Sequence, residues 1–251
     1  MSEREVTVGT EDGGMPTFIV HPDAGGPFPV ALLYMDAIGY REQVKENARR
    51  FAKDGYYCAA PDLFHRAGRG ITFDMRQMGA EQVRERMMTV ARSVTPERVI
   101  ADTLAVLHAV SSDPQAAQGA RVCVGYCMGA RLALHVAAVL SDQIVAAACI
   151  HPGALVTDAA DSPHHDLATV RGELYVAFAE IDPSATAEVV DRFRAEKERL
   201  GVRGTVERIP GVAHGFAMAD LPAYQKEAAE RHFEQTLDLW RRNLQAQPVA
   251  S

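Results

Sequence analysis

The feature that most constrains this chain is the alternation of short apolar runs with amphipathic segments. Each run is rich in β-branched, aromatic or small apolar residues and is too short for a helix of ordinary length. The runs are PVALLYM (29–35), YYCAAPD (56–62), ARVCVGY (120–126), IVAAACIH (144–151), ELYVAFA (173–179) and TVERIP (205–210). Unbroken apolar runs are typical of strands buried on both faces. The alternation therefore predicts an α/β fold with a mostly parallel central sheet and helices on both faces.

The segments between the runs carry helix signals. QVKENARRFAKDG has helical spacing and ends at Gly55, and the segment after Thr95 can be capped by that residue and ended by Pro114. The early segments EVTVG and TFIVHP predict an antiparallel edge hairpin. In such a fold the ligands gather at the carboxyl ends of the strands.

Length and composition favour one domain over residues 1–251. A chain of 251 residues that is 47% hydrophobic can bury a substantial core. The stretch 63–95, rich in Arg, Met and Gly, is expected to be the least regular part and is a candidate cap or substrate-lining segment. Residues 245–251 are expected to form a frayed tail.

Charge and cysteine usage narrow the function classes. With 26 Lys and Arg against 33 Asp and Glu, the formal charge of −7 opposes binding to nucleic acid. The N-terminus has no apolar signal segment, and no apolar run has a membrane-spanning length of about 18 residues. The 4 cysteines have neither metal-site spacing nor the density of a disulfide scaffold, so we expect reduced thiols in a cytoplasmic monomer or small homo-oligomer.

The segment Gly125-Tyr126-Cys127-Met128-Gly129 carries the chemistry. It follows the run RVCV and opens the helical segment ARLALHVAAVL, which is the context of a nucleophile elbow of the form G-x-C-x-G. A thiol at a helix N-terminus faces the positive end of the helix dipole, which favours the reactive thiolate. The backbone N–H of Met128 can hold a developing oxyanion. The alternative is that Cys127 is an inert buried residue, as we expect for Cys58, Cys123 and Cys149.

A base and an orienting acid follow in the order of the α/β-hydrolases. His214 comes just after the run TVERIP, and Asp182 comes just after the run ELYVAFA, so both are predicted at the same sheet edge as Cys127. Glu180 is the rival for the acid. Alternatively, His214 is a solvated loop residue and Asp182 is a helix cap before Pro183.

The loop after the first buried run supplies a second candidate oxyanion donor, the N–H of Ala37. Asp36 would then lie near the thiol and accept its S–H hydrogen bond at rest. The alternative is that Asp36 is an Asx-turn residue before Gly39.

On these motifs the sequence resembles the dienelactone hydrolase family, the carboxymethylenebutenolidases and their relatives. GYCMG, GYYCAAPDLFHR, the Asp182 turn and the HGF after Ala213 correspond to that family's landmarks over nearly the whole chain. The resemblance implies an α/β-hydrolase fold, a Cys-His-Asp triad at Cys127, His214 and Asp182, and oxyanion donors at Met128 and Ala37. It also implies that no metal or other cofactor takes part.

Two departures from the family bear on substrate. The best-known members have a glutamate where this chain has Asp36, and a substrate-binding arginine where this chain has Met218. A second family arginine lies in the segment matching roughly 63–90, where several arginines are available: Arg66, Arg69, Arg76, Arg84 and Arg86. The candidate pocket residues are apolar or aromatic apart from one histidine: Met35, Tyr126, Met128, Phe216, Met218 and His151. They favour a less anionic ester or lactone, although each is also ordinary core.

Three other functions compete with a lactone hydrolase. One is a broad carboxylesterase or thioesterase, and another is a catalytically silent hydrolase-like binding protein in which Asp36 suppresses the thiolate. The third is a redox-sensing thiol protein, which is disfavoured because Cys123 and Cys149 lie inside strand runs and no resolving cysteine is evident near the elbow.

Overall fold

The computed structural model describes residues 1–77, 79–160 and 162–245. The chain forms two compact units, residues 1–118 and 119–251, so the single domain stays a prediction. The strands are β1 (Ser2–Thr10), β2 (Gly13–His21), β3 (Val30–Tyr34), β4 (Tyr57–Pro61), β5 (Arg121–Tyr126), β6 (Ile144–Ile150), β7 (Glu173–Ile181) and β8 (Gly204–Ala213). The helices are α1 (Glu42–Lys53), η1 (Met75–Gln77), α2 (Glu81–Ser93), α3 (Pro96–Val110), α4 (Met128–Val139), η2 (Pro163–Ala168), α5 (Ala187–Arg199) and α6 (Lys226–Gln245).

The first unit contains the strand order β1-β2-β4-β3. The hairpin of β1 and β2 is antiparallel, β2 pairs antiparallel with β4, and β3 runs parallel to β4. All residues of β3 and β4 are buried, which is the burial expected from their unbroken apolar sequences. Helix α1 packs on β2 and β4, and α3 packs on β1 and β4. The predicted edge hairpin is confirmed.

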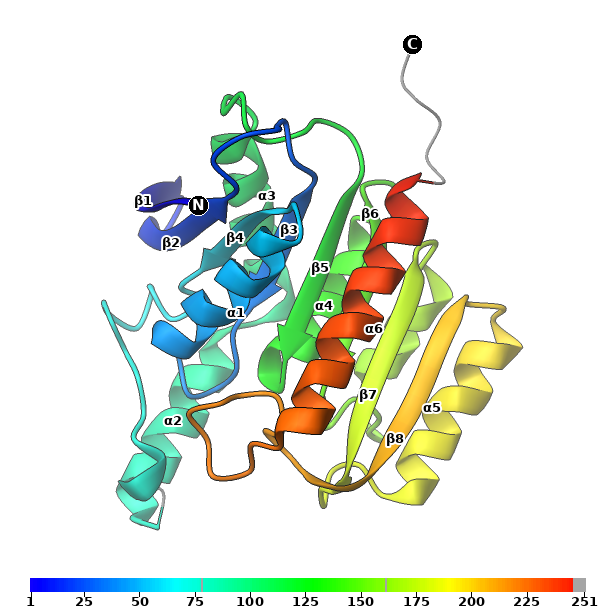
Figure 1. Ribbon diagram of the computed structural model, residues 1–251. Helices are drawn as coiled ribbons and strands as arrows, with labels where there is room; N and C mark the ends of the chain where they lie inside the picture. The colour runs from blue at the N-terminus through cyan, green and yellow to red at the C-terminus, as the bar shows by residue number, and fades with distance from the viewer. Residues whose placement is uncertain (78, 161, 246–251) are drawn as a thin grey trace. The chain divides into compact units, whose positions relative to one another are not determined.

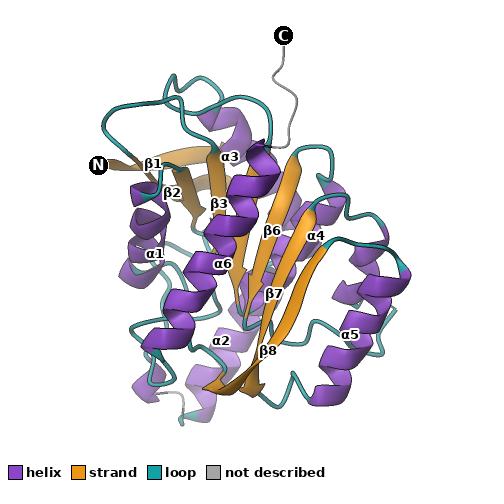
Figure 2. Ribbon diagram, turned by 45° about the vertical axis from the view of Figure 1, so that its right-hand side comes forward, coloured by secondary structure: helices purple, strands orange, loops and turns teal. Residues whose placement is uncertain are grey.

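The second unit is a purely parallel set of strands in the order β5-β6-β7-β8. Helix α6 crosses one face of β6 and β7, and α4 packs against β5 and β6 on the opposite face (Figures 1 and 2). This helix-on-both-faces arrangement confirms the predicted α/β architecture. Because the strands are parallel, their carboxyl ends all lie at one edge of this unit.

Helix ends follow the signals in the sequence. The Thr95 side chain accepts a hydrogen bond from the N–H of Arg98, 3.3 Å away, and so caps α3. Helix α1 ends at Lys53, and Gly55 then takes a positive φ of 95°, which a glycine adopts without steric cost.

The stretch 63–95 is more regular than its composition suggested. Its first part has turns and η1, but residues 81–93 form the helix α2, in which Val90 is buried and most other side chains are exposed. The helix forms because Glu, Gln, Arg and Met all have good helix propensity and neither Gly nor Pro interrupts them. The role of residues 63–95 as a cap or substrate-lining segment stays a prediction.

Helix α6 extends to Gln245, the first residue of the tail predicted over 245–251. Residues 246–251 of the predicted tail lie outside the described residues. Within the described part of the chain, none of the helices combines the length and the apolar character needed to cross a bilayer.

Candidate active site

Cys127 sits in a strained turn between β5 and α4. Its backbone angles, φ 54° and ψ −112°, lie in a region that residues other than glycine rarely adopt. Cys127 is the residue immediately before the helix. The N–H of Cys127 donates to the carbonyl of Ile150 at the end of β6, over 3.0 Å. The predicted strand-turn-helix is therefore present, with the thiol at its apex.

Gly125 makes this turn possible. A Cβ on Gly125 would collide with the backbone carbonyl of Gly129 in the first turn of α4. The close approach of strand and helix thus requires glycine at 125 for steric reasons.

The four cysteines differ in exposure as the sequence indicated. Cys58, Cys123 and Cys149 are fully buried, whereas Cys127 is half-buried. Burial raises the pKa of the Cys123 and Cys149 thiols, so both stay protonated and unreactive. Cys127 is therefore the cysteine that a reagent or substrate can reach.

Asp182 and His214 come together because β7 and β8 are paired. Ile181 and Ala213 are register partners, so the two residues that follow them leave neighbouring parallel strands side by side. Nδ1 of His214 lies 2.6 Å from Oδ2 of Asp182. Glu180, the rival acid, instead accepts a hydrogen bond from the Gly211 N–H and pairs with Arg208.

The Asp182–His214 pair is electrostatically coupled. Burial alone would raise the pKa of Asp182, but hydrogen bonds from His214 and Ser184 outweigh it and leave that pKa lowered. Burial would likewise lower the pKa of His214. The Asp182 carboxylate and the Cys127 side chain outweigh it and raise that pKa to about 10. His214 therefore interacts with both the Asp182 carboxylate and the Cys127 side chain, and the roles of base, acid and nucleophile expected for these three residues stay predictions.

His151 belongs to the same cluster. It follows Ile150, the register partner of Tyr126, and so leaves β6 beside Cys127. Its ring packs edge-to-face against His214, with centroids 5.0 Å apart, and against Phe216 at 5.4 Å. Its φ of 39° is strained and its side chain is buried.

The predicted pocket residues of this unit are packed inside it. Tyr126, Met128, Phe216 and Met218 are all buried. The Tyr126 hydroxyl lies 3.3 Å from Nε2 of the buried His232, a partner that sequence reasoning missed. Their contact with substrate stays a prediction.

Met35, Asp36 and Ala37 belong to residues 1–118, so their predicted places beside Cys127 stay predictions. Within that unit Asp36 is buried and forms a two-point ion pair with Arg41, at 2.6 Å and 3.0 Å. It also accepts the N–H of Ile38, which is the Asx-turn geometry. Asp36 is therefore already engaged by a cation and a backbone donor.

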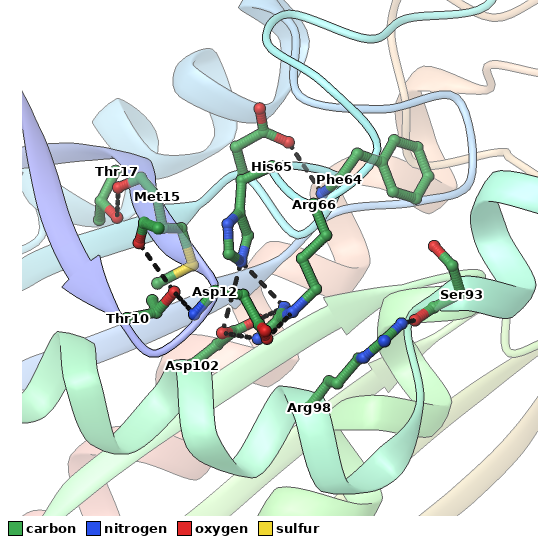
Figure 3. Close-up of polar contacts among 12 residues, drawn as sticks. Thr10, Asp12, Met15, Thr17, Phe64, His65, Arg66, Ser93, Arg98 and Asp102 are labelled. Carbon is green, nitrogen blue, oxygen red and sulfur yellow. Dashed lines mark hydrogen bonds and ion pairs between the residues drawn. The ribbon is translucent and has the colours of Figure 1, made fainter.

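The candidate arginines of 63–90 fall into distinct environments. Arg66 bonds both oxygens of the fully buried Asp102, each at 2.8 Å, and reaches Asp12 at 2.5 Å (Figure 3). Arg76 pairs with Asp74. Arg69 and Arg86 line a cleft together with polar and apolar residues between 70 and 83. Arg66 thus stabilises the fold, and a contact of Arg69 or Arg86 with substrate stays a prediction.

In residues 1–77, 79–160 and 162–245, no group of three or more His, Cys, Asp or Glu side chains is arranged to hold a metal ion.

Ser184 is the polar neighbour of the site that sequence reasoning did not single out. Its backbone N–H and its hydroxyl both lie 2.8 Å from Oδ1 of Asp182. The signal was available, because Asp-Pro-Ser is a sequence typical of an Asx turn.

The chain is similar to a known protein family and to several of its members. The model of the dienelactone hydrolase family matches residues 15–244. A candidate carboxymethylenebutenolidase of Methylorubrum extorquens is 26% identical over 243 residues, which cover 94% of this chain and 80% of that protein. One of Yersinia pestis is 24% identical over 239 residues, covering 93% and 86%. The crystal structure of a candidate dienelactone hydrolase from Klebsiella pneumoniae matches with a TM-score of 0.84 at 20% identity, covering 96% of this chain and 98% of that one. The structural likeness confirms the predicted α/β-hydrolase fold.

We expect Gly125→Ala to disrupt the elbow. The added methyl group meets the Gly129 carbonyl, so the variant should lose about 1–3 kcal/mol in the free energy of unfolding measured with urea. Gly9→Ala is the control, since a Cβ at Gly9 meets nothing within 4 Å, and it should change stability by less than about 0.5 kcal/mol. Equal stabilities of the two variants would contradict the close-approach argument.

We expect Arg66→Met to act on stability. Removing Arg66 leaves the buried Asp102 carboxylate without its two-point partner, which should cost roughly 3 kcal/mol in urea unfolding. The matched control is Arg76→Met, whose side chain is 89% exposed and which should change stability by less than about 0.5 kcal/mol. A stable Arg66→Met protein with a raised KM would instead make Arg66 a substrate ligand.

Proposed function

The chain belongs to the dienelactone hydrolase family, and from that premise we propose that it hydrolyses an ester or lactone through a thioester on Cys127. Hydrolysis of esters or lactones follows from the family. The observation that supports the assignment of residues is the half-buried thiol at a strained strand-helix turn, interacting with a His214 ring that Asp182 holds at 2.6 Å.

His214 activates the thiol in this proposal. Its Nδ1 hydrogen bond to Asp182 fixes the ring so that Nε2 is directed to the thiol, from which it takes the proton. The raised pKa of His214 means that the ring keeps this proton readily, which favours a thiolate-imidazolium pair. The carboxylate stabilises the positive ring but does not itself take the proton.

Acylation follows from that pair. The Cys127 sulfur attacks the acyl carbon, and the carbonyl electron pair moves onto oxygen to give a tetrahedral oxyanion. Met128 is the first residue of α4, and its N–H, which has no partner inside a helix, donates to that oxyanion. The C–O bond then breaks, and His214 gives its proton to the departing alkoxide.

Water completes the cycle. His214, neutral after acylation, takes a proton from water as the water oxygen attacks the thioester carbon. The C–S bond breaks, the acid leaves, and the thiolate-imidazolium pair is restored. For a lactone the alkoxide stays tethered to the acyl chain, and the product is a single hydroxy acid.

We infer that the substrate is less anionic than a dienelactone. Position 218, where the resemblance puts a substrate-binding arginine, is a fully buried methionine, and a methionine offers no charge-assisted hydrogen bond to a carboxylate. Tyr126 and Phe216, two further predicted pocket residues, are also buried and aromatic. A neutral acyl group suits such a lining better than an anion does.

A carboxylate-bearing substrate is the second candidate, and one observation favours it. Arg69 and Arg86 line the same cleft within residues 69–86, and two guanidinium groups are well suited to bind a carboxylate. The cleft lies within residues 1–118, and the preferred member of a substrate panel decides between the two substrate classes.

The test is hydrolysis of a panel of short p-nitrophenyl esters, neutral lactones and carboxylate-bearing enol lactones. We expect Cys127→Ala to lose nearly all turnover, and His214→Ala to lose about 10²–10⁴-fold in kcat, because each removes one partner of the acyl-transfer machinery. Neutral panel members should be preferred. A hydroxyl is far harder to ionise than a thiol, so Cys127→Ser should not restore the rate.

Two control variants accompany the panel. Cys149→Ala removes a buried thiol from the neighbouring strand, and His108→Ala removes an exposed histidine of α3. Both should keep wild-type kcat. Full activity in Cys127→Ala would contradict the nucleophile, and preference for the anionic lactones would favour the carboxylate-bearing substrate class.

A further inference from the structure

Asp182 uses its two carboxylate oxygens for different partners. Oδ2 lies 2.6 Å from Nδ1 of His214, and Oδ1 accepts both the N–H and the hydroxyl of Ser184, each at 2.8 Å. A carboxylate held at one oxygen by two donors cannot rotate about its last bond without breaking both hydrogen bonds. The two hydrogen bonds that Ser184 donates to Oδ1 therefore fix the orientation of Oδ2 towards the imidazole.

The hydroxyl of Ser184 adds something that the turn alone does not provide. In an Asx turn the backbone N–H two residues on donates to the Asp side chain, whatever that residue is. The N–H of Ser184 closes such a turn on Oδ1 of Asp182, and a β-turn over residues 182–185 overlaps it, closed by a 3.0 Å hydrogen bond from the N–H of Ala185 to the carbonyl of Asp182. The hydroxyl bond is additional to this backbone geometry, and it depends on the side chain at 184.

The loop after β6 lies over Ser184 and His214 together. A Cβ built on Gly153 would lie 3.7 Å from Cε1 of His214 and 3.9 Å from Oγ of Ser184. Asp182 itself is only 8% exposed. The Asp182 carboxylate is therefore shielded from water, which strengthens the hydrogen bonds that it accepts, whereas 32% of the His214 side chain stays exposed.

We propose that Ser184 is a positioning residue for the acyl-transfer site, fixing Asp182 through its hydroxyl so that Asp182 orients and charges His214. The inference rests on the proposed function, since it names a further residue acting on the same thiol and imidazole. Ser184 touches neither Cys127 nor the reacting atoms in this account, and it acts only through Asp182.

The pH dependence that follows has a definite sign. A donor removed from the carboxylate raises the pKa of Asp182, so the Asp182–His214 hydrogen bond is lost at a higher pH as the solution is acidified. The titratable groups that face this pair are Cys127, immediately before α4, and His151 after β6. The Glu180–Arg208 pair of β7 and β8 lies next to it in sequence and is unchanged by substitution at 184.

The experiment compares Ser184→Ala and Ser184→Thr with the wild type in two assays across pH. One assay is ester hydrolysis on the panel above. The other is alkylation of Cys127 by iodoacetamide, which needs no turnover and is selective because the other cysteines are fully buried. For Ser184→Ala we expect kcat to fall about tenfold with KM changed less than about twofold, because a hydrogen bond to a charged group is lost in the machinery and not in substrate binding.

In the same variant the acid limb of both pH profiles should move to higher pH by roughly half a unit or more. Ser184→Thr keeps a hydroxyl and should return kcat and the acid limb to wild-type values. The matched control is Thr186→Ala, which removes the cap of α5 by deleting the acceptor of the Val189 N–H but touches no part of Asp182. It should lower the melting temperature and leave kcat and both acid limbs unchanged.

A purely structural Ser184 would lower the melting temperature without moving the acid limb, and that result overturns the proposal. So does a Thr variant that behaves like the Ala variant. If the wild type shows no Cys127-dependent hydrolysis, the proposed function fails, while the alkylation profiles still decide whether Ser184 acts on the thiol. If the wild type hydrolyses through Cys127 and Ser184→Ala matches it in both assays, the inference about Ser184 alone fails.

Discussion

The close approach of β5 and α4 at Gly125 is the constraint on which the rest of the site depends. It lets the chain reverse from a buried strand into a helix within one residue, and that residue, Cys127, must then adopt a positive φ. Such a conformation costs about 1–3 kcal/mol. The cost is offset by the surrounding packing, in which the Cys127 N–H is held by Ile150 of β6 and the first helical turn is buried.

The partners of the thiol reach it through strand register. Tyr126 pairs with Ile150, so Cys127 and His151 leave adjacent strands together, and Ile181 pairs with Ala213, so Asp182 and His214 do the same. Parallel strands that are buried on both faces have little freedom to slip, because a shift of one residue would exchange the side chains packed against α4 with those packed against α6. The edge-to-face contact of His151 with His214 then links the two pairs of residues. The geometry of the site is therefore a consequence of core packing.

Much of this arrangement could be predicted from the sequence because it depends on local patterns. Apolar runs gave the strands, Thr95 and Gly55 gave helix ends, and the glycine spacing around Cys127 located the elbow. The features that could not be predicted are contacts between side chains that lie far apart in the sequence. The pairing of Arg66 with Asp102 and the contact of Tyr126 with His232 leave no trace in spacing. The helix α2 was missed for a different reason, since its Arg- and Met-rich sequence lacks a clear apolar stripe and only Val90 is buried.

The central claim is a covalent thioester on Cys127, and trapping it is the most direct measurement. The protein is mixed with a p-nitrophenyl ester, quenched in acid within the first turnover, digested with trypsin, and analysed by mass spectrometry. Cleavage after Arg121 and Arg131 releases a peptide that carries both Cys123 and Cys127, and fragmentation distinguishes them. We expect one acyl group, on Cys127, that is absent in His214→Ala over the same interval. An acyl group on another residue, or rapid turnover with an unmodified Cys127, would contradict it.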